Sequence, residues 1–125
     1  MNKGEDIQNM LIDFAVDGIR VAEKLPRSIA GRHIASQLVR SSTSGAPNYA
    51  EARSAESRKD FIHKLRIVLK ELNESAIWLK MILRARLLKE AECRSFLESC
   101  ESLCRIIGKS VATSKKNIND IHQEI

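Results

Sequence analysis

The sequence predicts an all-α protein, an antiparallel up-and-down four-helix bundle. Its 125 residues include only 4% aromatic residues, 5 glycines and 2 prolines, and Ala, Leu, Glu, Lys, Arg and Ser dominate. This composition is typical of helix bundles. Apolar residues recur at spacings of three and four in four segments, as on one face of a helix. Short connections place successive helices side by side in opposite directions, and this length favours one domain, residues 1–125.

The first predicted helix covers about residues 5–25. Its inner stripe consists of Ile7, Leu11, Phe14, Gly18, Val21 and Leu25. Pro26 ends the helix, because proline disfavours the helical conformation of the preceding residue. Gly18 lowers helix propensity, so we expect a neighbouring helix to approach its backbone closely in compensation.

The second predicted helix covers residues 31–54 and has a small, partly polar seam. The stripe is Ile34, Leu38, Ser41, Gly45, Asn48 and Ala52. A buried Asn48 must find hydrogen-bond partners or cost about 1–3 kcal/mol. Pro47 removes the amide that would bond the Thr43 carbonyl, so we expect a bend or local break at Thr43–Pro47. The alternative is a helix that stops at Ser44 and restarts at Pro47.

The third predicted helix, residues 57–84, begins at a capping box. The Ser57 hydroxyl can accept a hydrogen bond from the Asp60 amide, and the Asp60 carboxylate can accept one from the Ser57 amide. The inner stripe is Phe61, Leu65, Val68, Leu72, Ser75, Leu79 and Ile82. Four large apolar residues fall off this stripe and form a candidate surface for self-association: Ile67, Ile77, Trp78 and Met81.

The fourth predicted helix covers residues 88–114. The turn before it lies within Arg84–Lys89, where no Gly or Pro marks it, and a polar tail at 115–125 is expected to fray. The inner face carries Cys93, Phe96, Cys100, Leu103 and Ile107. Cysteines at spacings of seven and four lie along one side of a helix, where disulfide geometry is out of reach, so we interpret them as reduced core residues.

The charge pattern permits a polyanionic partner. The chain carries 21 Lys and Arg against 16 Asp and Glu, a formal charge of +5. Two acid-free segments concentrate this excess and supply the candidate nucleic-acid-binding residues, which are Arg27, Arg32, Arg40, Arg105, Lys109, Lys115 and Lys116. The alternative is a solvated surface with Arg–Glu pairs.

No catalytic or metal constellation is visible in the sequence. Asp60 and His63 have the carboxylate-x-x-His spacing of di-iron bundles. Such bundles need two of these motifs and two further inward carboxylates, and this sequence has only one motif. We therefore expect neither an enzyme nor a cofactor. The N-terminal residues lack the order of a secretion signal and no apolar run reaches membrane-spanning length, so a cytoplasmic protein is expected.

Two motifs carry a family resemblance that covers nearly the whole chain. Arg40, Ser44, Asn48 and Glu51 have the spacing R-x3-S-x3-N-x2-E, and Phe61, Lys70-Glu71, Glu74 and Trp78 follow on the third helix. This pattern resembles the bacterial four-helix-bundle family of proteins encoded inside intervening sequences of large-subunit ribosomal RNA genes. Pro47, Ala52 and Arg86 depart from its usual residues and leave local bends open. Arg40 is expected to pair with Glu71 and Glu74, in a structural role.

The resemblance implies a protomer that assembles into a ring of five chains. It also implies a thin functional record, in which the understood relatives are accessory proteins of diversity-generating retroelements that bind a reverse transcriptase and its RNA or DNA. One hypothesis is therefore a ring-forming adaptor that binds nucleic acid by charge, with a reverse transcriptase as a further partner. The other is a structural or protein-binding assembly module with no nucleic-acid role.

Overall fold

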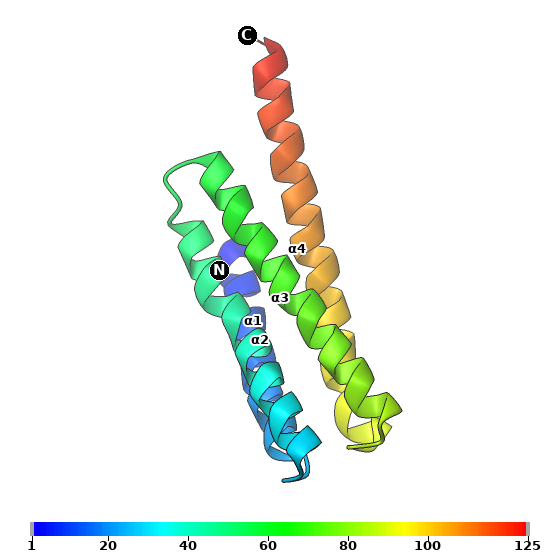
Figure 1. Cartoon of the computed structure of the whole chain (residues 1–125). Coiled ribbons are helices and arrows are strands. Elements are labelled where there is room, and N and C mark those ends of the chain that lie inside the picture. Colours follow the sequence, from blue (N-terminus) through cyan, green and yellow to red (C-terminus); the bar gives the residue numbers. More distant parts are fainter. Residues whose placement is uncertain (1, 125) are drawn as a thin grey trace.

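A computed structural model describes residues 2–124, and the side chains as far as residue 118. This part of the chain forms α1 (Lys3–Glu23), α2 (Ile29–Arg53), α3 (Arg58–Arg84) and α4 (Glu90–Glu124), without a strand. Each helix runs antiparallel to the next, and α1 and α4 meet to close the bundle (Figure 1). The predicted all-α four-helix bundle is confirmed, whereas the ring stays a prediction.

Side-chain caps begin the first three helices. The Ser57 hydroxyl accepts a hydrogen bond from the Asp60 amide at 3.1 Å, as predicted. Asn2 Oδ1 accepts from the Glu5 amide at 2.8 Å, and Ser28 Oγ accepts from the Gly31 amide at 3.1 Å. These caps satisfy amides that have no partner inside the helix. They explain why α1 and α2 begin slightly earlier than predicted.

The predicted stripes meet in one core. Leu38, Leu65, Leu79 and Ile107 have no exposed side-chain surface, and the rings of Phe14 and Phe96 stack with centroids 4.6 Å apart. Three predicted stripe residues are only half-buried, namely Ile34, Asn48 and Phe61. The core therefore follows the apolar repeats closely, because each repeat marks the side of its helix that faces the other three.

Gly18 lies where α1 packs closely against Ser42 of α2 and Phe96 of α4. A Cβ atom placed there would overlap Ser42 Oγ, lie 2.6 Å from Ser42 Cβ and lie 3.3 Å from the Phe96 ring. The expected close approach at Gly18 is confirmed. The missing side chain is what allows α2 to pack against α1 at this level.

α2 continues through Pro47 without interruption, so the expected local break and the alternative stop at Ser44 are wrong, while the expected bend stays a prediction. Pro47 lies on the exposed side of α2, where water can reach the Thr43 carbonyl that loses its amide partner. Asn48 Nδ2 donates to the Ser44 carbonyl at 2.9 Å and to Ser44 Oγ at 3.1 Å. The half-buried Asn48 thus finds the partners that were expected.

The turn between α3 and α4 is built on Arg86, which has a left-handed φ of 57°. The Leu87 amide donates to the Ile82 carbonyl at 3.0 Å, and the Arg86 amide donates to the Leu83 carbonyl at 3.2 Å. This pair of bonds is a Schellman motif, in which glycine usually takes the left-handed position. An arginine there explains why the sequence does not mark the turn.

α4 is longer than predicted and extends to Glu124, so the backbone of 115–124 continues the helix that was expected to end at 114, while fraying of this segment stays a prediction. No Gly or Pro interrupts this segment, and nothing in its sequence stops the helix. The Cys100 thiol on α4 donates a hydrogen bond to the Leu72 carbonyl on α3. Because the two helices are antiparallel, the start of α3, fourteen residues before Leu72, lies beside Ser114, fourteen residues after Cys100. Beyond that level α4 projects past the other helices (Figure 1).

Candidate functional site

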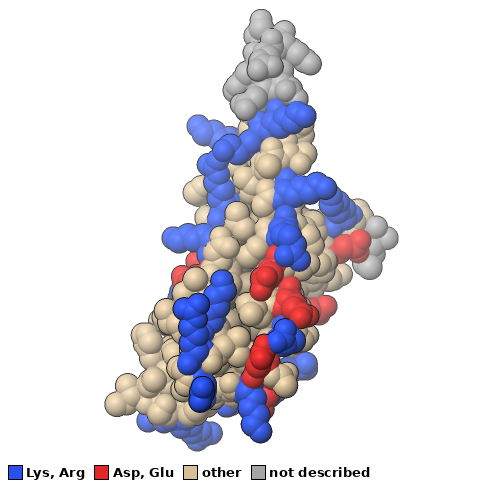
Figure 2. Space-filling view, turned by 90° about the vertical axis from the view of Figure 1, so that its right-hand side faces the viewer, with Lys and Arg blue, Asp and Glu red and all other residues tan. Residues whose placement is uncertain are grey.

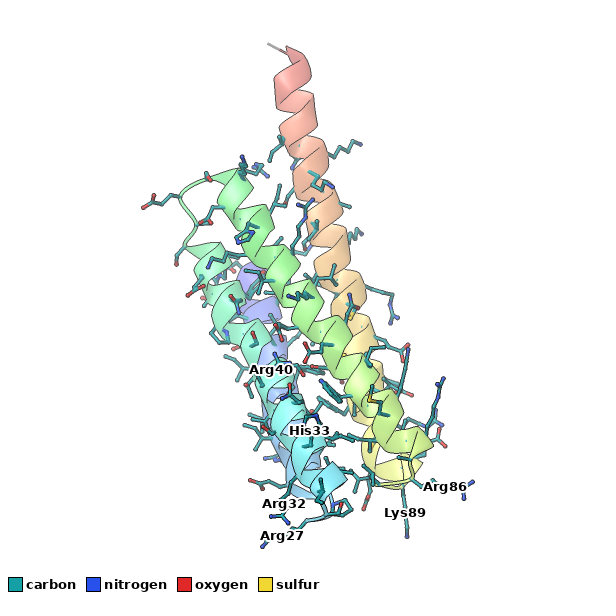
Figure 3. The ribbon with its side chains drawn as sticks, in the orientation of Figure 1. Arg27, Arg32, His33, Arg40, Arg86 and Lys89 are labelled. Carbon is teal, nitrogen blue, oxygen red and sulfur yellow. The ribbon has the colours of Figure 1, made fainter. Side chains whose placement is uncertain are left out.

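The antiparallel order brings two basic connections to one end of the bundle, which we call the double-turn end. The α1–α2 and α3–α4 connections both lie there, opposite the α2–α3 connection and the C-terminus (Figure 1). Arg27 and Arg32 come from the first connection and the start of α2, and Arg86 and Lys89 come from the second (Figure 3). All four side chains are exposed. The structure therefore adds two cations to the predicted pair.

The second acid-free segment lies far from the double-turn end. Lys109, Lys115 and Lys116 are exposed on the distal half of α4, toward the end that also holds Arg53 and Arg58. Figure 2 shows Lys and Arg over this upper part of the molecule, whereas Lys and Arg lie among Asp and Glu lower down. Arg105 is exposed part-way along α4. The predicted cations therefore form two separate basic regions rather than one.

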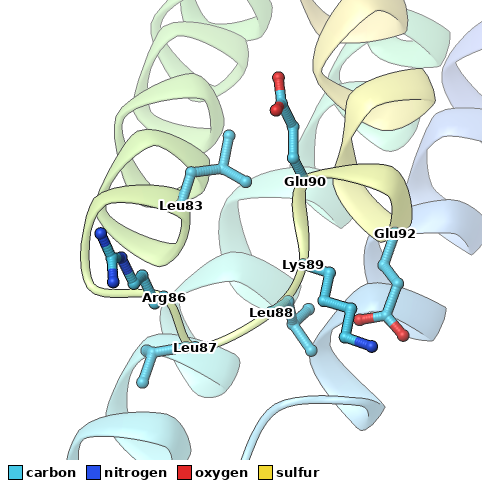
Figure 4. A pocket seen from close by; sticks show the side chains of 7 residues that line it. All are labelled: Leu83, Arg86, Leu87, Leu88, Lys89, Glu90 and Glu92. Atoms are coloured by element: carbon cyan, nitrogen blue, oxygen red, sulfur yellow. The ribbon is translucent and has the colours of Figure 1, made fainter.

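Each connection at the double-turn end borders a hollow. The hollow of about 750 Å³ at the α3–α4 connection is lined by Leu83, Arg86, Leu87, Leu88, Lys89, Glu90 and Glu92 (Figure 4). The hollow of about 420 Å³ at the α1–α2 connection is lined by Ala22, Glu23, Leu25, Pro26, Arg27, Gly31, Arg32 and Ala35. Each combines two cations with apolar walls, and the glutamates offset part of the positive charge.

Arg40 belongs to a polar network between α2 and α3. Its Nη1 lies 3.1 Å from Glu71 Oε2, its Nη2 pairs with Glu74, and its Nε donates to Gln37 Oε1 at 3.1 Å. The predicted pairing of Arg40 with both glutamates is confirmed. Because two carboxylates already hold its guanidinium, Arg40 is poorly placed to contribute free positive charge to a nucleic-acid surface.

The remaining motif residues also make contacts within or between α2 and α3. Ser44 accepts from Asn48, and Glu51 Oε2 lies 2.9 Å from Lys64 Nζ across the two helices. Deeper in the same contact, the buried Ser75 hydroxyl lies 2.9 Å from Ser41 Oγ. The Glu51–Lys64 and Ser41–Ser75 contacts join α2 to α3 and fix their register, which is a structural role.

The residues predicted for self-association occupy the outer side of α3. Ile77 is 50% exposed and Met81 is 45% exposed, whereas Ile67 and Trp78 are half-buried. Trp78 Nε1 donates to Glu74 Oε2 at 3.0 Å, and the His33 ring meets the indole edge-on at 5.9 Å. The Arg40 network thus holds Trp78 in place beside two exposed apolar side chains. A fixed aromatic residue beside exposed apolar surface is typical of an association surface.

The cysteines are free thiols, as predicted. The contact with Cys104, together with burial, raises the pKa of the Cys100 thiol, and the same contact lowers the pKa of Cys104. Burial also raises the pKa of Cys93. Cys93 and Cys100 are therefore protonated core residues at neutral pH. Among the described side chains, no three His, Cys, Asp or Glu residues are grouped so that they could hold a metal ion.

The comparisons with known proteins agree with this architecture. The family model described as "23S rRNA-intervening sequence protein" matches residues 5–109. The chain belongs to this family. The family match covers all of α2 and α3, the whole Arg40 network and both connections of the double-turn end. It ends before the projecting part of α4.

A similar protein of known structure comes from Bacteroides thetaiotaomicron VPI-5482. Its 1.70 Å crystal structure is described as a protein of unknown function from the S23 ribosomal protein family. The two chains are 28% identical, the match covers 84% of this chain and 97% of that chain, and the TM-score is 0.79. Among curated proteins, none matches the chain. Within the described residues, no helix is long and apolar enough to cross a membrane.

Proposed function

We propose that the protein is a non-enzymatic adaptor that binds the backbone of RNA or DNA through its double-turn end. The observation that carries the proposal is the convergence of Arg27, Arg32, Arg86 and Lys89 from two separate connections (Figure 3). In the described part of the chain, none of these four side chains forms an ion pair with a carboxylate. Their charge is available to phosphates.

Backbone binding needs exposed cations rather than a base-reading element, and the double-turn end offers only the former. Each Lys or Arg that neutralises a phosphate releases a counterion, so the affinity falls as salt rises. Assembly of several chains would repeat the surface and multiply its potential.

The test is fluorescence anisotropy with a labelled short single-stranded RNA and the matching DNA, at about 50 and 200 mM salt. The wild-type protein should bind at low salt and lose most of its affinity at high salt. The variant with Arg32→Glu and Lys89→Glu should bind at least about tenfold more weakly, because two attractive contacts become repulsive.

Its matched control is the variant with Lys115→Glu and Lys116→Glu, which carries the same charge change at the opposite end. The control should retain most of its binding. Failure to bind at low salt, or an equal loss in both variants, would contradict the proposal for the double-turn end. Circular dichroism should show the same helical content in all three proteins.

A second candidate function is a protein-binding assembly module with no nucleic-acid role. It is favoured by the outer side of α3, where Ile77 and Met81 are exposed beside the fixed Trp78. Such a protein would ignore RNA and DNA at low salt while still associating through α3. The reverse transcriptase implied by the family resemblance stays a prediction under either function.

A further inference from the structure

A third hollow is a groove between the start of α1 and the distal half of α4, at the end opposite the double-turn end. It has a volume of about 430 Å³. Its floor is apolar and is formed by Ile7, Tyr49, Phe61 and Ile106, and its charged residues are Lys3 and Lys109. No carboxylate lines it among the described residues. The groove thus combines an apolar floor with a positive rim.

The groove exists because the helices differ in length at this end. α1 begins at Lys3 and α3 begins at Arg58, but α4 continues to Glu124 and projects beyond both (Figure 1). α4 packs mainly on α3 and touches α1 over a shorter stretch. One side of α4 therefore lacks a neighbouring helix. On its other side, Ser114 is buried and Ile118 is half-buried. The position of a further packed helix is open at this end.

We propose that this groove is the docking site for an acidic amphipathic helix of a partner protein. A helix with apolar residues on one face would cover the floor and extend along the projecting part of α4. Charge complementarity identifies it as acidic. From Ser102 to Ile118 α4 has no acidic residue, and it carries the exposed cations Arg105, Lys109, Lys115 and Lys116.

Two other occupants fit the groove less well. A nucleic-acid backbone could contact the exposed cations, but it would leave the apolar floor uncovered, and Tyr49 is only 5% exposed and offers no face on which a base could stack. A second copy of α4 would bring the same positive charges against Lys109 and Lys115, and like charges would oppose the contact. The proposal is independent of the double-turn end, which lies at the other end of the bundle.

The test uses a designed, fluorescently labelled peptide, an amphipathic helix with leucines on one face and glutamates flanking them. The full-length protein should bind it saturably, and a peptide with lysine in place of each glutamate should not bind. Thr113→Trp should weaken binding at least about tenfold, because an indole would fill the groove. Ala112→Trp, an exposed neighbour that does not line the groove, is the matched control and should bind like the wild type.

A second variant keeps the result interpretable if Thr113→Trp fails to fold. Lys109→Glu should weaken binding of the acidic peptide and strengthen binding of the basic one. Lys80→Glu, on the exposed side of α3, should change neither affinity. Amide NMR shifts on adding the acidic peptide should concentrate at Lys3, Ile106 and Thr113. Equal binding of both peptides, shifts located elsewhere, or shifts at these residues with RNA instead would overturn the proposal.

Discussion

At the scale of single residues, Gly18 is a position where helix packing leaves no room for a side chain. We predict that Gly18→Ala destabilises the protein by about 1–3 kcal/mol, because the added methyl group overlaps Ser42 and must push α1 and α2 apart. Urea denaturation followed by circular dichroism measures the change in the free energy of unfolding. Ser42→Gly in the same protein should recover part of the loss by removing the overlapping side chain.

Gly108 is the matched control, since a Cβ there would meet no atom within 4 Å. Gly108→Ala should stabilise the protein by about 0.5–1 kcal/mol, the usual gain when alanine replaces glycine inside a helix. If Gly18→Ala proved as stable as the wild type, the close approach of α1 and α2 would not constrain the fold.

Single residues also show where the sequence was sufficient and where it was not. The pairing of Arg40 with Glu71 and Glu74 could be predicted, because the helical repeats place all three on adjoining sides of α2 and α3. The role of Arg86 could not, because its left-handed backbone depends on the hydrogen bonds that end α3 rather than on its residue type. The sequence also did not indicate Arg86 as a candidate cation of the double-turn end, because Glu90 and Glu92 follow it and it therefore lies outside the acid-free segments.

At the scale of the helix, α2 carries a proline that it does not need for packing. We predict that Pro47→Ala stabilises the protein by about 2 kcal/mol, because the new amide can bond the Thr43 carbonyl and the exposed ring leaves no cavity. Thermal unfolding measures the effect. A substitution of another exposed residue on α2, Ala50→Ser, is the control and should lower stability only slightly.

A loss of stability in Pro47→Ala would mean that α2 needs a proline-induced bend to follow α1 and α3. The sequence left this question open, because a proline inside a helix can end it or be absorbed within it, and solvent exposure decides between the two. The length of α4 was open for a similar reason. A polar segment without Gly or Pro can fray or continue as a helix, and its side-chain composition alone does not distinguish these outcomes.

At the scale of the whole molecule, the two basic regions lie at opposite ends of the bundle, and the exposed apolar side chains Ile77 and Met81 lie in the last two turns of α3, next to the double-turn end. The apolar repeats predict the inside of the bundle well, since burial there is decided by one periodic signal. They do not predict how cations from different connections gather, because this depends on which ends of the helices lie together. The double-turn end arises from the antiparallel order of four helices and from no local motif.

The association surface gives the last prediction. The purified wild-type protein should elute from size exclusion with a light-scattering mass well above one chain, about five chains if the family resemblance holds. Met81→Glu should reduce the mass toward that of a monomer without loss of helical content, because a carboxylate would be buried against the neighbouring chain without a partner. Ile12→Glu tests the competing apolar side of α1, where Met10, Ile12, Val16 and Ile19 are exposed, and it should leave the mass unchanged if α3 alone mediates assembly. A monomeric wild type, or dissociation by Ile12→Glu alone, would show that α3 does not mediate self-assembly and would make Trp78 a contact for a different protein.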